Sequence, residues 1–392
     1  MFNVTVSRLE GWENQVALKK GLGMSGGPSQ GDSACLEEAT NQTLDATRHG
    51  EATREIEAFL RSRIVGQDAA VDAVLELYQI FLVGMSAPDR PVGNLLFLGP
   101  TGSGKTYVVE VLAEALFGNP HAFIKVDCAE FQEHHEIAKL IGSPPGYIGH
   151  MHTQPILTQE ALTRWHTEKL KLTLLLFDEI EKASESLWQL MLGILDKASL
   201  TLGDNTHVDL SQCIIFMTSN VGAPEMSRLA EGGLGFAVQA PIENANLDER
   251  ITHVATEAAR RKFSPEFMNR LDKVVVFNTL RPDQLEHILE LELAKVQRRI
   301  ASALGPNHFT FRCTPEIKQW LLREGTDPRY GARHLKRVTE KSIVYGLANL
   351  VATNQVKGGD CVSIGIKADG TLTFAKIAAT VSEESVAVGS MP

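Results

Sequence analysis

Length, composition and charge place the chain in the class of ordinary globular proteins. Its 392 residues, 43% hydrophobic and 22% charged, are enough for one large core or two modest ones. The formal net charge of −10 argues against nucleic acid as a partner, and no apolar run is long enough to cross a membrane. The first residues show no secretory signal and the five cysteines form no C-x-x-C pair, so we expect a cytoplasmic protein without disulfides or a zinc site.

The N-terminal segment, residues 1–52, is expected to be poorly ordered. Residues 21–33 are rich in Gly, Ser and Pro, and residues 41–51 are polar. Apolar residues begin to recur at helical spacing only after residue 53, so we place the start of the folded part there.

Residues 53–278 alternate short apolar runs with helical segments, which is the pattern of a parallel sheet with crossover helices. We therefore predict an α/β subdomain, a P-loop parallel sheet with helices on both faces, with ligands at the carboxyl ends of its strands. The expected strands are Leu95–Leu98, Phe123–Asp127, Leu172–Phe177, Cys213–Thr218 and Val274–Phe277.

Residues 279–377 are expected to form a smaller, mostly α-helical subdomain. Helical spacing begins at Thr279 and ends at Gly305, and two more helices are expected over 314–325 and 334–353. Residues 361–366 and 372–375 flank Asp369-Gly370 and predict a C-terminal β-hairpin. Residues 378–392 are expected to be a flexible tail.

A phosphate-binding loop is predicted between the strand that ends at Leu98 and a helix over 107–117. A glycine-rich turn in this position directs backbone N–H groups at phosphate oxygens, and the helix N-terminus adds positive partial charge. Lys105 supplies a full charge and the Thr106 hydroxyl can hold Mg²⁺. A chance glycine-rich loop is the alternative, but the strand–loop–helix context favours a nucleoside triphosphate. The loop, GPTGSGKT, consists of Gly99, Pro100, Thr101, Gly102, Ser103, Gly104, Lys105 and Thr106.

Polar side chains end two further apolar strands. Asp178 can hold Mg²⁺, and Glu179 can act as general base on the attacking water, as in a Walker B motif. Asn220 follows the next strand, where its amide could orient that water together with Glu179. Taken alone, a strand with a charged loop and an Asn in a turn are common features.

Seven segments in this order resemble the second ATPase domain of the Clp/heat-shock AAA+ unfoldases, such as ClpB and ClpC. The resemblance covers roughly residues 54–376. Its segments are residues 64–67, 99–106, 142–149, 175–183, 217–222, 263–272 and 327–337.

The resemblance implies a role for each matching residue. Val65, Gly66 and Gln67 would cradle the base. Asn220 would be the sensor that positions water, and Arg333 the second sensor. Arg270 would be the arginine finger that reaches the γ-phosphate of a neighbouring subunit, which implies a homo-hexameric ring. For either arginine in isolation, a surface ion pair is the alternative.

Two loops carry hypotheses about partners. Tyr147 and Ile148 resemble the pore loop that grips a polypeptide substrate, with a packed Pro-Gly turn as the alternative. Leu234, Gly235 and Phe236 match the tripeptide with which some Clp ATPases dock on a peptidase, or fold back onto the core as an ordinary loop.

The resemblance implies an ATP hydrolase that uses ATP and Mg²⁺ to pull on polypeptides. The alternatives are a remodeller of one protein complex that does not thread its substrate, a regulatory subunit of a Clp-type protease, and a nucleotide-binding scaffold without turnover. No first ATPase domain or middle domain precedes the matching module, so we do not expect a full disaggregase. Residues 150–155, His-Met-His-Thr-Gln-Pro, also depart from the family's acidic stretch.

Overall fold

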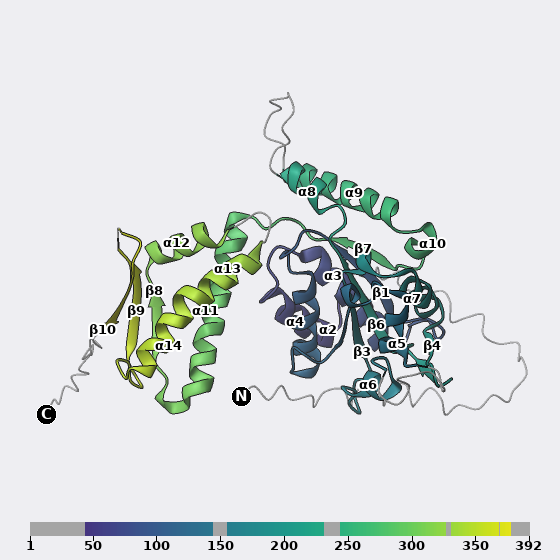
Figure 1. Cartoon of the computed structure of the whole chain (residues 1–392), viewed down its shortest axis with the longest axis horizontal. Coiled ribbons are helices and arrows are strands. Elements are labelled where there is room, and N and C mark those ends of the chain that lie inside the picture. The colour runs from purple at the N-terminus through teal and green to yellow at the C-terminus, as the bar shows by residue number, and fades with distance from the viewer. Residues whose placement is uncertain (1–43, 144–154, 231–243, 327–330, 368, 378–392) are drawn as a thin grey trace, which may run out of the picture. The chain divides into compact units, whose positions relative to one another are not determined.

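The computed structural model of the chain describes residues 44–143, 155–230, 244–326, 331–367 and 369–377 (Figure 1). Within these ranges the first regular element is α2 (Glu51–Arg61). The segment expected to be poorly ordered lies outside the described residues up to residue 43, and so does the expected tail from residue 378. None of the helices in the described ranges combines the length and the apolar character needed to span a bilayer.

A five-stranded parallel sheet forms the centre of the α/β part, with the strand order β2-β3-β6-β1-β7. Each expected strand is present to within two residues at either end, so the predicted parallel sheet is confirmed. The strands are β1 (Gly93–Leu98), β2 (Ile124–Asp127), β3 (Thr173–Asp178), β6 (Cys213–Ser219) and β7 (Lys273–Val276).

Helices cover both faces of this sheet. Successive residues of a strand point to opposite faces, so a strand made of consecutive apolar residues needs cover on both sides. On β1, Leu95 and Phe97 belong to the core that includes α3 (Asp68–Leu82) and α4 (Lys105–Phe117). The other helices of this part are α5 (Ala138–Ile141), α6 (Gln159–Thr163), α7 (Glu185–Lys197), α8 (Ala223–Ala230), α9 (Asn244–Lys262) and α10 (Pro265–Met268).

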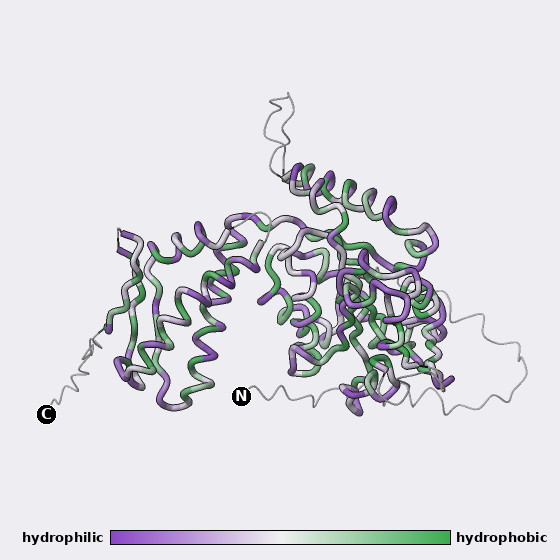
Figure 2. The backbone as a smooth tube through the Cα atoms, viewed as in Figure 1, coloured by the Kyte–Doolittle hydropathy of each residue, from purple (hydrophilic) through white to green (hydrophobic). Residues whose placement is uncertain are grey.

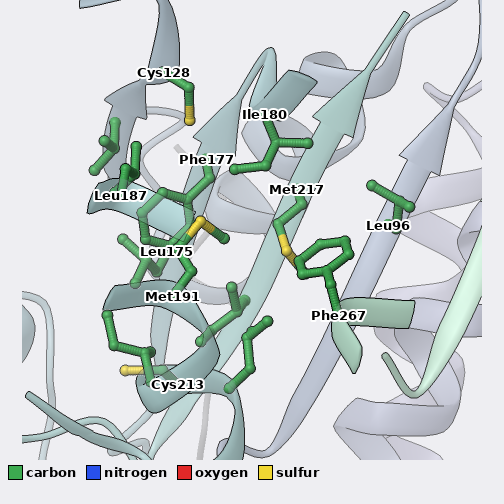
Figure 3. Close-up of a cluster of buried hydrophobic side chains, with 14 of the residues drawn as sticks. Leu96, Cys128, Leu175, Phe177, Ile180, Leu187, Met191, Cys213, Met217 and Phe267 are labelled. Atoms are coloured by element: carbon green, nitrogen blue, oxygen red, sulfur yellow. The ribbon is translucent and has the colours of Figure 1, made fainter. Parts of the chain in front are cut away.

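The opposite face of the sheet packs on α7, α9 and α10. Figure 3 shows Leu175, Phe177 and Met217 from the strands beside Met191 of α7 and Phe267 of α10. All five side chains are buried. Apolar burial of this kind contributes about 2 kcal/mol for each large side chain and fixes the strand ends that carry the site.

The C-terminal part is mostly helical and has its own core. Apolar side chains of its helices and strands are buried together around Leu289, Leu321 and Leu335, and the helices alternate hydrophilic and hydrophobic residues along their length (Figure 2). Its helices are α11 (Pro282–Leu304), α12 (Pro315–Gly325), α13 (Ala332–Thr339) and α14 (Tyr345–Ala352), with a π-helical turn over Glu340–Val344 between the last two. The helix expected over 334–353 is therefore present as one continuous helical stretch, with a π-helical turn in its middle.

A three-stranded sheet closes this part. The predicted hairpin is confirmed as β9 (Cys361–Ile366) and β10 (Leu372–Ile377), paired antiparallel. β8 (Thr310–Cys313) adds to β9 in parallel and was not predicted, because its four residues are only partly buried. The short hairpin of β4 (Ser199–Thr201) and β5 (His207–Asp209) was also not predicted, because each of its strands has only three residues.

Candidate functional site

Three loops meet at one edge of the central sheet. The GPTGSGKT loop follows β1, Asp178 and Glu179 end β3, and Asn220 follows β6. Because β6 pairs in parallel with both β1 and β3, the carboxyl ends of these strands are neighbours. The structure therefore brings the predicted loop and the predicted carboxylates together.

These loops line a cleft of about 710 Å³. Arg63 and Glu114 lie at another part of its wall and form an ion pair with each other. Ile64 and Val111 supply apolar surface of the kind that suits a nucleobase. The predicted site residues that line the cleft are Val65, Gln67, Thr101, Gly102, Ser103, Gly104, Lys105, Thr106, Asp178, Glu179, Asn220 and Arg333.

Three predicted site residues, Gly66, Gly99 and Pro100, are not among the residues that line the cleft. A Cβ atom on Gly66 would lie 2.5 Å from the Gln284 side chain, and one on Gly99 would lie 2.7 Å from the Phe277 carbonyl oxygen. Both glycines also have positive φ angles, 71° and 155°, so side chains are disfavoured there. These residues allow the loop to pack closely on the chain behind it.

Lys105 is the first residue of α4 and is held inside the loop. Its Nζ atom donates to the carbonyl oxygens of Gly99 at 2.7 Å and Pro100 at 2.9 Å, and to Asn220 Oδ1 at 3.0 Å. Burial, only partly offset by nearby carboxylates, lowers the pKa of Lys105 from 10.5 to about 8. A phosphate in the loop would give the buried ammonium a full counter-charge.

Asp178 lies between two donors. Its Oδ2 atom is 2.7 Å from the Nζ atom of Lys125, and its Oδ1 atom accepts from the Thr218 hydroxyl. Burial by itself would raise the pKa of Asp178, but hydrogen bonds from Lys125 and Thr218 outweigh it and hold the pKa below its ordinary value. The Thr106 hydroxyl is 3.5 Å from Asp178 Oδ1, so hydroxyl and carboxylate oxygens face the same space.

Glu179 and Asn220 touch each other. The Asn220 Nδ2 atom donates to Glu179 Oε1 at 3.4 Å, and Lys182 pairs with the other carboxylate oxygen. Glu179 has a φ of 57°, in the left-handed region, and its N–H donates to the Thr218 hydroxyl at 3.0 Å. The side chain is 35% exposed, which leaves the carboxylate accessible to water.

Two further residues support the site. Glu181 was not assigned a site role from the sequence, whereas Gln67 was expected to cradle the base with Val65 and Gly66. Glu181 Oε1 accepts from the Asn220 backbone N–H at 3.0 Å, and its other carboxylate oxygen is buried without a partner in the described part of the chain. Gln67 donates to the carbonyl oxygens of Ser103 at 3.2 Å and Asn278 at 3.1 Å, which ties the loop to the chain after β7. The acidic run around Glu179 was the available signal for Glu181.

Arg333 reaches the cleft from the start of α13. The N–H of Ala332 donates to the Gly102 carbonyl oxygen at 3.3 Å. Gly331, with a φ of 51°, lies so close that a Cβ atom would be 2.9 Å from the same oxygen. The charge of Arg333 contributes to lowering the pKa of Lys105, after the larger effect of burial. The structure thus places Arg333 beside the predicted phosphate loop.

Of the four predicted catalytic residues, Glu179, Asn220 and Arg333 line this cleft and Arg270 does not. One guanidinium nitrogen donates to the Glu266 carbonyl oxygen at 3.0 Å, and another is 3.7 Å from an Asp196 carboxylate oxygen. The side chain is 22% exposed. Arg270 is therefore held in an ion-pair network outside the cleft.

The remaining predicted residues lie outside the part of the chain that the structure describes. They are the proposed pore-loop residues Tyr147 and Ile148 and the proposed docking tripeptide Leu234, Gly235 and Phe236.

The residues fit Mg²⁺, which prefers hard oxygen ligands and retains several waters. The Thr106 hydroxyl and the Asp178 carboxylate supply such oxygens beside the phosphate loop, and the open cleft leaves room for waters and phosphate oxygens.

Two family models match the chain. Residues 90–274 match the model described as an AAA domain of the Cdc48 subfamily, and residues 280–364 match the C-terminal D2-small domain of ClpB. The chain contains an AAA+ ATPase domain of the Clp type. Nucleotide binding is a property of this family, and the two matched segments cover the central sheet and the helical part in order.

Similar proteins include Clp ATPases of several organisms. A Clp protease ATP-binding subunit, the ClpA homologue of Pyropia yezoensis, is 35% identical over 82% of this chain and 38% of its own length. The chaperone ClpB of Agrobacterium fabrum is 35% identical over 85% of this chain and 35% of its own length. The chain therefore spans well under half the length of these relatives.

The fold also resembles a solved structure. A closed-state cryoEM reconstruction of Hsp104 with ATPγS and FITC-casein matches with a TM-score of 0.68 and 29% identity, over 83% of this chain and 52% of the Hsp104 chain.

Proposed function

We propose that the protein is an ATP hydrolase of the Clp type that assembles as a homo-hexameric ring and uses ATP to pull on polypeptides. One observation carries the proposal. Lys105, Asp178, Glu179 and Asn220 converge on one cleft, whereas Arg270 is held outside it. A site of this kind is complete only if Arg270 is supplied by a neighbouring subunit.

ATP would bind with its phosphates in the Gly99–Thr106 loop and its base near Val65. Lys105 would leave its carbonyl acceptors for phosphate oxygens, and Arg333 would contact the phosphates from α13. Mg²⁺, held by Thr106 and Asp178, would neutralise charge on the phosphates.

Glu179 would take the proton of the attacking water. Its carboxylate is partly exposed, and the Asn220 amide at 3.4 Å is placed to orient the same water. Lys182 pairs with Glu179 Oε2. The oxygen that would accept the proton from water is therefore Oε1, which is also the oxygen that Asn220 contacts. Arg270 from the next subunit would stabilise the charge that spreads over the transferred phosphoryl group.

Polypeptide as the substrate is supported by the relatives and by the sequence of residues 146–149, Gly-Tyr-Ile-Gly. The relatives carry the names of chaperones and of Clp protease subunits, and the Hsp104 reconstruction includes FITC-casein. Docking on a peptidase through Leu234, Gly235 and Phe236 stays a prediction, and so does a cytoplasmic location.

Two variants test the function. Glu179→Gln should bind ATP without hydrolysing it. Tyr147→Ala should hydrolyse ATP at a rate near that of the parent but should no longer unfold a stable tagged test protein. Tyr147→Phe keeps the aromatic side chain and should still unfold that protein. Equal unfolding by the parent and Tyr147→Ala would favour a remodeller that does not thread its substrate.

A further inference from the structure

A row of cations lies on one exposed face of the helical part. The residues recur at spacings of three, four and eight along α13 and the π-helical turn, so they share one side of the helix. Together with Tyr345, whose side chain is 68% exposed, they line a shallow groove of about 790 Å³. The cations of this basic face are Arg333, Lys336, Arg337 and Lys341.

The basic face keeps its positive charge in the isolated subunit. Glu340, the carboxylate that also lines the groove, accepts two hydrogen bonds from Arg299, at 2.9 and 3.1 Å. Over the described ranges, no carboxylate lies within ion-pair distance of the four cations. In a chain with a net charge of −10, such a face is suited to an acidic partner surface.

An acidic stripe of matching character runs along α3. Asp68, Asp72 and Glu76 are four residues apart, so they stack on one side of the helix, and their side chains are 78%, 56% and 61% exposed. Arg61 is shared among Asp68, Asp72 and Glu57. Glu76 pairs with Lys273, so two cations face four carboxylates and the acidic stripe stays negative.

The acidic stripe is joined to the segment that carries Arg270. Glu76 Oε2 is 2.9 Å from the Nζ atom of Lys273, three residues after Arg270. Arg90, which precedes β1 in the chain, lies 3.8 Å from Asp272 of the same segment and donates to the Arg270 carbonyl oxygen at 3.4 Å. The surface around the proposed finger therefore includes Glu76 of the acidic stripe.

The basic face, in turn, is continuous with the nucleotide cleft. Arg333 and Lys336 line both the cleft and the groove. If Arg270 of one subunit enters the cleft of the next, the surface beside Arg270 must meet the helix that carries Arg333.

We infer that the basic face of one subunit docks on the α3 acidic stripe of a second copy of this chain. The inference rests on the proposed ring and identifies the surfaces that make it. Two different surfaces of one chain that complement each other give a head-to-tail contact, which closes into a ring if the rotation permits. Complementary charge at this contact sets the register in which Arg270 meets its target.

Paired charge reversals test the inference. A basic-face reversal changes Arg337→Glu and Lys341→Glu, and an acidic-stripe reversal changes Asp72→Lys and Glu76→Lys. All four side chains are exposed, and neither pair includes a residue of the proposed catalytic machinery. Lys357→Glu with Lys367→Glu is the control, because it changes the net charge of the same part by the same amount at exposed positions off the groove.

Assembly is measured by sedimentation velocity with ATP and Mg²⁺, in the Glu179→Gln background so that ATP is not consumed. Each reversal alone should raise the protein concentration for half-assembly by about tenfold or more. An equimolar mixture of the two should assemble within about threefold of the parent, because alternating subunits place opposite charges at every contact. The control should behave like the parent, and raising salt from about 0.05 to about 0.5 M should weaken parent assembly.

Thermal melting and ATP affinity establish that each variant is folded. Reversal variants that assemble as the parent does would overturn the inference and leave the ring intact. Reversals that fail both alone and mixed would show that the two surfaces are not partners. If the lysine control lost assembly to the same extent, the effect would come from net charge alone, and this result would also overturn the inference. A parent that stays monomeric with ATP would contradict the proposed ring itself.

Discussion

Lys105 and Arg270 are both cations of the proposed ATP site, but the fold holds them in opposite ways. Lys105 is 8% exposed, donates to three acceptors at the cleft and has a lowered pKa because it is buried. Arg270 is 22% exposed and lies in an ion-pair network with Asp196 and Glu266 away from its own cleft. The difference fits the proposed roles, because Lys105, which would serve its own subunit, is fixed by the core, whereas Arg270, which would serve a neighbour, is held in ion pairs at the surface.

The largest expected effect concerns a residue that serves its own subunit. Glu179→Gln removes the general base and keeps the size of the side chain, so ATP hydrolysis should fall by roughly 10²- to 10⁴-fold while ATP still binds. Turnover assays and equilibrium binding measure the two properties separately. Glu185→Gln, an exposed change at the start of α7, serves as the control. Hydrolysis by Glu179→Gln at the parent rate would show that another group is the base.

The next effect concerns Lys105. Lys105→Ala should weaken ATP binding by about 100-fold or more, because the phosphates lose their buried cation. Lys262→Ala removes an equal charge at an exposed position and should leave affinity unchanged. If both variants bound ATP equally well, the phosphate loop would not be the binding site.

A smaller effect is expected where α13 touches the phosphate loop. Gly331→Ala places a Cβ atom 2.9 Å from the Gly102 carbonyl oxygen, so the loop must shift and ATP affinity should fall by about tenfold. Gly305→Ala is a matched control, since Gly305 has a similar φ of 56° with no atom within 4 Å of the added carbon. Both variants should lose about 1 kcal/mol of unfolding free energy, but only Gly331→Ala should lose affinity.

The smallest effect is a pH dependence. Lys105 is charged in the free protein only below its pKa of about 8, whereas bound phosphate would keep it charged. ATP affinity should therefore be constant below pH 8 and fall above it, by up to about tenfold per pH unit. Calorimetry in buffers of different ionisation enthalpy should detect proton uptake on binding above pH 8. Lys105→Arg stays charged, so its residual affinity should not change over this range.

The same pKa affects stability with a defined sign. In the unfolded chain Lys105 has its ordinary pKa of 10.5, so between pH 8 and 10.5 the unfolded state holds more protons. The contribution of Lys105 to the free energy of unfolding should increase with pH across this range and be lost as pH falls through 8. The difference between parent and Lys105→Arg melts isolates this contribution.

Features of the fold and site that are local in sequence could be predicted from it. The phosphate loop, Asp178, Glu179 and Asn220 each follow an apolar run, and the order of strands along the chain implies a parallel sheet. Lys125 could not be assigned to the site, because its contact with Asp178 depends on the pairing of β2 with β3.

Other features depend on neighbours that lie far away in the sequence. Gln67 binds the chain after β7, 211 residues away, and β8 exists only because β9 pairs with it. The ion pair between Arg270 and Asp196 likewise joins residues that lie far apart in the sequence. Local sequence patterns do not encode such contacts. The sequence therefore predicted the residues of the site better than it predicted the residues that hold them in place.

The most direct test of the account is complementation between two inactive variants. Arg270→Ala should fold, bind ATP and be nearly inactive, and Arg260→Ala, a change in an exposed ion pair on α9, should be as active as the parent. Mixing Arg270→Ala with Glu179→Gln should restore ATP hydrolysis, because some interfaces then combine an intact Arg270 with an intact Glu179. Full activity of Arg270→Ala alone, or no recovery in a mixture that co-assembles, would contradict completion of the site by a neighbouring subunit.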